Sequence, residues 1–173
     1  MEDILDILKY ILPSGIVFAT AYFLLKAFID NDNRKKLIEI KTNNQALINP
    51  IRLQAYERII LLLERISPGS LIMRVAQPNM TAFQFQTALI QTIRDEFEHN
   101  LSQQIYISSN AWELTRNAKE EMIKLVNIAA SRLNDNASAT DLGSIIFELS
   151  MQKDKLPLNQ AIEFTKKEVR QLF

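Results

Sequence analysis

The sequence contains no cysteine, and it has only three glycines, five prolines and one histidine in 173 residues. Without cysteine the chain forms no disulfide and offers no thiol nucleophile or thiolate metal ligand. Three isolated glycines cannot build a glycine-rich phosphate loop, and no Gly-x-Ser-x-Gly elbow is present. Because turn-forming residues are scarce, the sequence favours a few long elements over many short strands and predicts an all-α protein.

Neither sign of charge is in excess, because twenty acidic residues balance twenty lysines and arginines. A protein dedicated to nucleic acids normally carries a strong basic excess. We therefore expect no nucleic-acid partner. Since the chain also has no cysteine, no Gly-x-Ser-x-Gly elbow and only one histidine to serve as a base, we predict no catalytic residue, no cofactor and no enzymatic activity.

The chain does contain a run of sixteen uncharged residues, Tyr10–Leu25, with a lysine at each end. As a helix this run would measure about 24 Å, which is short of the ~30 Å hydrocarbon layer of a bilayer. Flanking lysines that extend their stems toward the headgroups lengthen the usable span to residues 7–29. We therefore predict a transmembrane anchor over residues 1–32. The predicted membrane-interface residues are basic or aromatic and flank this run: Lys9, Tyr10, Tyr22, Lys26, Arg34, Lys35 and Lys36.

Two alternatives compete with the anchor. One is a buried core helix, although such helices are usually interrupted sooner by a polar face. The other is a cleaved signal peptide, because Ala19-Thr20-Ala21 resembles a small-x-small cleavage site. The acidic amino terminus and the continuation of the apolar run as far as Leu25 favour the uncleaved anchor.

The flanking charges predict an orientation in the inner (cytoplasmic) membrane. Four lysines and arginines between Lys26 and Lys36 follow the run, whereas only Lys9 precedes it. Positively charged flanks stay in the cytoplasm, so the N-terminus is expected outside and the C-terminal domain in the cytoplasm. The bilayer is then one partner. Gly15 and Ala19 form a small-xxx-small pair that allows a protein partner or a second copy to pack closely within the membrane.

The remaining chain divides into a basic juxtamembrane segment with a hinge, residues 33–48, and a helical domain, residues 49–173. Polar residues 42–45 mark the hinge. Asn49 is a suitable N-cap and Pro50 suits the first position of a helix that ends at Ile66. The apolar residues of that helix cover most of its circumference, which places it in the middle of a bundle.

Four further helices complete a predicted cytoplasmic bundle of about five. Thr81 and Gln84 form a capping box before a ridge of apolar residues spaced by four. Asn110 starts the next helix, whose small residues form a narrow packing seam. Residues 141–151 and 158–172 form the last two helices. Periodicity does not assign residues 71–76, and residues 102–107 are interpreted as an extended connector.

One histidine deserves consideration as a metal ligand. Glu96-x-x-His99 has the spacing of half a carboxylate-bridged di-iron site, which needs a second half from another chain or from Glu57, Glu113 or Glu121. The simpler interpretation is an acidic helix end at which His99 meets the negative end of the helix dipole. We therefore predict no metal, with Glu96 and His99 as the only candidates.

The chain resembles, from end to end, a family of uncharacterised, short bacterial membrane proteins with one N-terminal transmembrane helix. Four stretches carry the resemblance: residues 1–5 (MEDIL), Tyr56–Ile66, Ile93–Asn100 and Ala118–Met122. None of these stretches is a mechanistic motif. The resemblance implies an architecture and no assigned activity.

The leading functional hypothesis is a membrane-anchored helical interaction or scaffold module, or a small subunit of a membrane assembly. It follows from a predicted anchor joined to a packed domain without catalytic groups. The alternatives are a metal-dependent enzyme that uses the Glu96/His99 half-site, and a lipid-surface binder that uses residues 34–36 and the terminal helix.

Overall fold

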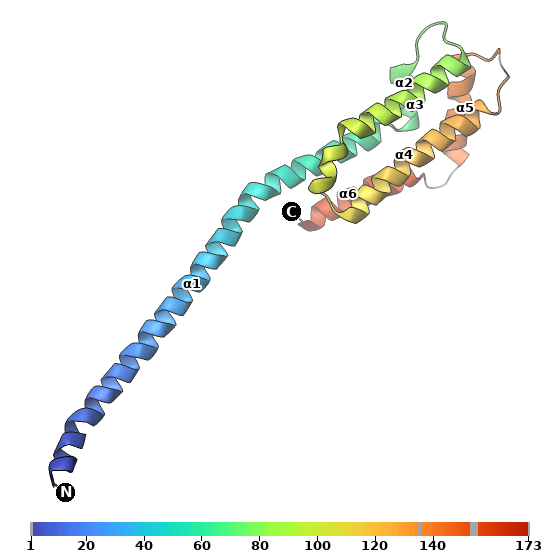
Figure 1. The fold of residues 1–173 in the computed structure, drawn as a ribbon. Helices are drawn as coiled ribbons and strands as arrows, with labels where there is room; N and C mark the ends of the chain where they lie inside the picture. The colour runs from blue at the N-terminus through green and yellow to red at the C-terminus, as the bar shows by residue number, and fades with distance from the viewer. Residues whose placement is uncertain (1, 135, 153–155, 173) are drawn as a thin grey trace. The chain divides into compact units, whose positions relative to one another are not determined.

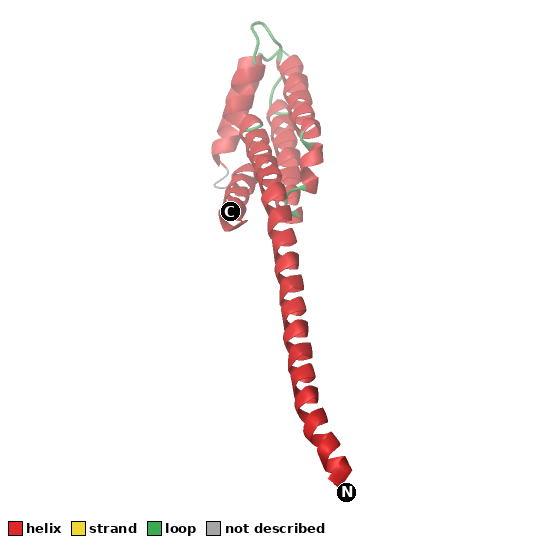
Figure 2. Cartoon of the chain, turned by 90° about the vertical axis from the view of Figure 1, so that its left-hand side faces the viewer, coloured by secondary structure: helices red, strands yellow, loops and turns green. Residues whose placement is uncertain are grey.

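The computed structural model describes residues 2–134, 136–152 and 156–172, and it describes side chains within the first helix from residue 15 onward, apart from residues 37, 38, 40, 41, 43 and 44. All regular elements of these residues are helices, as predicted, and Figure 2 shows no strand among them. The chain divides into two compact units, residues 1–49 and residues 50–173.

Helix α1 (Glu2–Arg65) begins in the first unit and ends in the second (Figure 1). Within the first unit, its residues between 16 and 29 expose large apolar side chains: Ile16, Val17, Phe18, Tyr22, Phe23, Leu24, Leu25, Phe28 and Ile29. Charged and polar residues follow from Asp30 onward.

The predicted transmembrane anchor is not supported. Within the described residues, no helix contains a stretch that stays apolar over the length needed to cross a bilayer. The uncharged run alone falls about 6 Å short of the hydrocarbon layer, and Asp30 and Asp32 follow closely behind it. Our prediction of a single-pass inner-membrane protein, N-terminus out and C-terminal domain cytoplasmic, is therefore wrong.

The predicted helix start at Asn49 and Pro50 is absent, because α1 continues through Thr42 and Pro50. The two compact units meet at this point of the chain, and the hinge stays a prediction. Polar residues 42–45 resemble a loop in sequence, yet none of them is incompatible with a helix. A proline inside a helix removes one backbone hydrogen bond, while the bonds on either side persist. Asn49 therefore does not cap a new helix.

Among its described residues, the second unit contains the end of α1 and six shorter helices. They are α2 (Pro68–Val75), α3 (Ala82–His99), the 3₁₀ helix η1 (Leu101–Ile105), α4 (Ser109–Ala130), α5 (Ala139–Gln152) and α6 (Pro157–Leu172). Residues 71–76, which periodicity did not assign, thus lie largely in α2. Residues 102–107 are not an extended connector, since most of them form η1.

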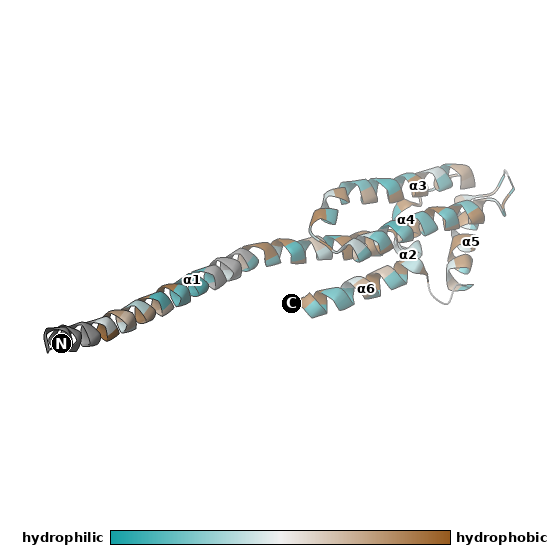
Figure 3. Ribbon diagram, turned by 60° about the horizontal axis from the view of Figure 1, so that its bottom comes forward, coloured by the Kyte–Doolittle hydropathy of each residue, from teal (hydrophilic) through white to brown (hydrophobic). Residues whose placement is uncertain are grey.

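One apolar core joins the helices of the second unit. Helix α4 packs against α3, α5 and α6, and α2 packs against α3 and α5. Figure 3 shows teal and brown alternating along these helices, as expected of amphipathic helices in a bundle. The predicted seam of α4 is confirmed, because its residues are buried: Ala111, Thr115, Ala118, Met122, Leu125 and Ala129. The ridge predicted for α3 is confirmed for the buried residues Phe85, Leu89, Ile93 and Phe97. Its predicted last member, Leu101, lies in η1 and is 46% exposed.

Side-chain caps fix the starts of two helices, α3 and α4. The predicted capping box of α3 is confirmed, with Thr81 Oγ1 accepting from the Gln84 amide at 3.2 Å and Gln84 Oε1 accepting from the Thr81 amide at 3.1 Å. Helix α4 is capped by Ser108, whose hydroxyl accepts from the Ala111 amide at 3.1 Å, and not by Asn110 as predicted. The cap thus lies two residues earlier.

The starts of α3 and α5 are joined by a short antiparallel bridge between Thr81 and Ser138. The Ala82 amide donates to the Ala137 carbonyl at 2.9 Å, and the Ala139 amide donates to the Met80 carbonyl at 3.1 Å. Both donors lie at helix N-termini, where backbone amides lack partners within the helix.

Candidate functional site

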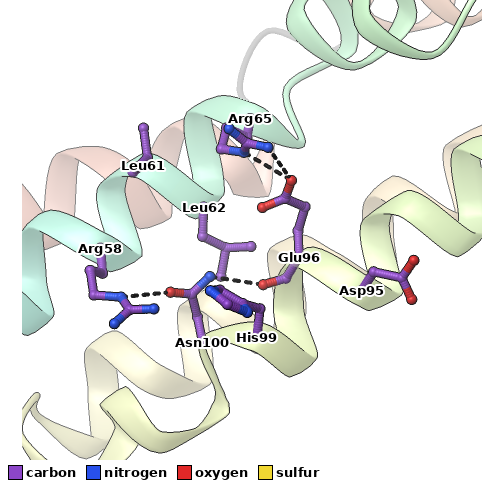
Figure 4. Close-up of a pocket in the computed structure, with 8 residues that line it drawn as sticks. All are labelled: Arg58, Leu61, Leu62, Arg65, Asp95, Glu96, His99 and Asn100. Carbon is purple, nitrogen blue, oxygen red and sulfur yellow. Dashed lines mark hydrogen bonds and ion pairs between the residues drawn. The ribbon is translucent and has the colours of Figure 1, made fainter.

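The outer face of α1 in the second unit carries the candidate site. Leu62 and Leu63 are buried at 1% and 0% exposure, whereas their neighbour Leu61 is 58% exposed. Leu61 and Leu62 project from opposite sides of the helix (Figure 4). Leu61 lines two surface hollows, one on the side of α3 and one on the side of α6. It is therefore an exposed leucine with a hollow on either flank.

The first hollow, here called the arginine hollow, has a volume of about 470 Å³ and lies between α1 and α3. Its lining residues are Arg58, Leu61, Leu62, Arg65, Asp95, Glu96, His99 and Asn100. Arg65 donates to Glu96 Oε1 through Nε at 2.9 Å and through a terminal nitrogen at 2.6 Å, as the dashed lines in Figure 4 show. Arg74 of α2 donates to the same oxygen at 2.7 Å. Two guanidinium groups thus share one carboxylate.

Asn100 holds the other end of the arginine hollow. Its side chain is 6% exposed, and its amide nitrogen donates to the Glu96 carbonyl at 2.9 Å. Its oxygen accepts from Arg58 Nε at 3.3 Å. The C-terminal end of α3 therefore positions both the carboxylate that holds Arg65 and the amide that holds Arg58 (Figure 4).

The ionisation of Glu96 reflects these contacts. Partial burial acts to raise the pKa of the carboxyl, but hydrogen bonds from Arg65 and Arg74, together with their positive charges, outweigh burial and lower it. A carboxyl whose pKa is lower in the folded than in the unfolded chain stabilises the fold above its unfolded pKa. That contribution disappears as the pH falls through the folded pKa.

We expect Glu96→Gln to remove this acid-sensitive part of the stability. The variant should be about 1 kcal/mol less stable near neutral pH, and the difference should vanish at a pH below the lowered pKa of Glu96. Urea unfolding, followed by circular dichroism from neutral pH down to below the pKa of Glu96, measures the free energy of unfolding of the variant and of the wild type. Glu98→Gln, which changes an exposed acid on the same helix, is the control. A constant difference between wild type and Glu96→Gln at every pH would contradict the assignment.

The arginine hollow brings together the two candidate metal ligands, Glu96 and His99, with Asp95 beside them. His99 is the last residue of α3, as the helix-end interpretation predicts, and it is exposed. Glu96, however, is already bound by two guanidinium groups, whose charges oppose a cation. Across the described residues, no three histidine, aspartate or glutamate side chains gather in a metal-binding arrangement, Glu57, Glu113 and Glu121 included.

The second hollow, here called the α1–α6 groove, has a volume of about 460 Å³ and an apolar floor. Leu53, Tyr56, Ile60, Leu61 and Val169 supply the apolar lining. Four charged side chains complete it, with both acids on α1 and both bases on α6: Glu57, Glu64, Lys166 and Arg170. The two walls thus carry charges of opposite sign.

The predicted sites of the first unit lie apart from these hollows in sequence. Gly15 and Ala19 are exposed, and nothing lies within 4 Å of the position that a Cβ at Gly15 would take. Tyr22, Lys26, Arg34 and Lys35 are exposed, and Lys36 pairs with Asp32 at 2.9 Å. The side chains of Lys9 and Tyr10 lie outside the described residues. The packing and membrane-interface roles of all these residues stay predictions.

Sequence reasoning noticed only part of this site. It placed the helix that ends at Ile66 in the middle of the bundle and gave no function to its charged residues Arg58 and Arg65. Arg58, Leu61 and Arg65 are spaced by three and four, which places them on one face of α1. That spacing was the available signal. Arg74 offered none, because its partner Glu96 lies 22 residues away in the chain.

The profile of a family of unknown function, DUF7935, matches residues 2–172. The match confirms the resemblance to an uncharacterised family. Neither the curated proteins nor the solved structures contain a significant match to this chain.

Proposed function

The chain belongs to this family of unknown function, and we propose that it is a helical protein-interaction module that docks its partner on the face of α1 around Leu61. Such a module serves as a scaffold or as a small subunit of a larger assembly. The observation that carries the proposal is Leu61 itself, an exposed leucine between two hollows.

Energetics support a docking role for this face. Burying a leucine side chain contributes about 1.5–3 kcal/mol. Interface hot spots are apolar or aromatic anchors set among polar groups that exclude water, and Arg is enriched among them. Leu61 has the apolar groove on one flank and Arg58 and Arg65 on the other. The face thus combines an anchor, an apolar recess and a charged rim.

The shape of the α1–α6 groove indicates what kind of element it receives. Two antiparallel or parallel helices with an apolar floor between them form a typical acceptor for an amphipathic helix. The floor residues accept the apolar side of such a helix. The acids and bases of the walls then lie beside its polar flanks.

Site-specific photocrosslinking in cells tests the proposal. A photoreactive residue at position 61 should yield one discrete crosslinked product, because a docked partner covers this position. The same residue at position 73 is the control, since Met73 is 83% exposed and lines neither the arginine hollow nor the α1–α6 groove. No product at position 61, or equal products at both positions, would refute the proposal.

A further inference from the structure

We infer that the partner received by the α1–α6 groove is a second copy of this chain, an inference that rests on the proposed function. The groove is self-complementary: its α1 wall carries Glu57 and Glu64, and its α6 wall carries Lys166 and Arg170. Few unrelated surfaces match both walls at once. A second copy does so by symmetry.

The charges of the walls are available for a partner. In the part of the chain that the structure describes, no ion pair involves Glu57, Glu64 or Arg170. Among the described residues, the ion pair of Lys166 is with Glu163 of its own helix, at 3.4 Å. Neither wall therefore neutralises the other within one chain.

Two-fold symmetry pairs these charges between chains. In a two-fold dimer the same surface serves both copies, so that if residue i contacts residue j, then j contacts i. A two-fold axis that runs along the groove, in the plane of the interface, places the α1 wall of each copy over the α6 wall of the other. Each pair of acids then faces a pair of bases, twice in the dimer, while the apolar floors and Leu61 become covered.

Long-range electrostatics do not oppose this pairing. The net charge of the chain is zero, so two copies approach without overall repulsion. Complementary charges at the rim set the register of an interface, and like charges placed opposite one another cost several kcal/mol. Reversal of the charges of one wall should therefore weaken the dimer.

Two charge-reversed variants of the full chain test the inference. Variant one is Glu57→Lys with Glu64→Lys, and variant two is Lys166→Glu with Arg170→Glu. Wild type should form dimers, whereas each variant alone should associate at least about tenfold more weakly, because like charges then face each other. Light scattering over a range of concentrations measures the mass, and circular dichroism confirms that both variants are folded.

A mixture of the two variants gives the decisive result. Each contact then joins lysines or arginines of one variant to glutamates of the other, so a mixed dimer should form with near wild-type affinity. Native mass spectrometry of differently tagged chains detects it. The control reverses two exposed acids outside the groove, Glu98→Lys with Glu113→Lys, and should leave the wild-type dimer intact.

Several outcomes would overturn the inference. They are a monomeric wild type at every concentration, an association that neither variant weakens, and a mixture that forms no mixed dimer. If the exposed apolar residues 16–29 cause the association instead, neither charge-reversed variant should weaken it. If position 61 crosslinks to a different protein and the chain is monomeric, the proposed function stands and this inference fails.

Discussion

Replacing Leu62 with aspartate should unfold the helical unit of residues 50–173. Leu62 is 1% exposed, and the change removes leucine packing worth about 2–5 kcal/mol. It also places a carboxylate in a buried position, and the nearest bases, Arg58 and Arg65, are already bound to Asn100 and Glu96. The sum approaches the whole free energy of unfolding of a domain, about 5–15 kcal/mol. Far-UV circular dichroism with urea unfolding measures the loss.

Leu61→Asp is the matched control, since it makes the same chemical change at the adjacent residue. Because Leu61 is 58% exposed, the new carboxylate reaches water and should cost less than about 1 kcal/mol. The two variants thus separate the structural side of α1 from its docking side. A Leu62→Asp protein as stable as Leu61→Asp would show that α1 does not belong to the core.

Phe85→Ala should destabilise the same unit by about 3–5 kcal/mol. Phe85 is 1% exposed and lies on α3 facing α2 and α5. A Cβ added to Gly143 of α5 would stand 3.9 Å from the Phe85 ring and 3.5 Å from Ile72 of α2. Loss of the ring therefore leaves a cavity between three helices. The midpoint of urea unfolding should fall accordingly.

Phe83→Ala is the control on the same helix. Phe83 is 75% exposed, so its removal should change the free energy of unfolding by less than about 0.5 kcal/mol. Both substitutions raise helix propensity to the same extent. Equal effects of the two substitutions would contradict the position of Phe85 in the core.

Local patterns in the sequence predicted what depends on local geometry. The Thr81/Gln84 capping box involves residues three apart, and the α4 seam repeats every three or four residues, so both follow from helix geometry. The sequence-based prediction failed at residues 49 and 50, where a local signal for a helix start did not decide the structure. Asn49 and Pro50 indicated a helix start, but the structure continues the helix through them.

Contacts between distant residues lay beyond sequence reasoning. The carboxylate of Glu96 binds Arg65, which lies 31 residues earlier, and no periodicity within one helix pairs them. The exposure of Leu61 also depends on how α3 and α6 pack beside α1, because residues of these two helices line the hollows on its flanks. In sequence it was one apolar residue among the run from Ile59 to Leu63. The candidate site therefore emerged from the tertiary structure.

The bridge between Thr81 and Ser138 has a consequence for how the second unit opens. Each helix N-terminus ordinarily frays by itself, since its first amides have no partner within the helix. Here the Ala82 and Ala139 amides bind the chain that precedes the other helix. Unwinding the first turn of α3 thus releases the start of α5 as well. Two helix ends that are 57 residues apart in sequence behave as one cooperative unit.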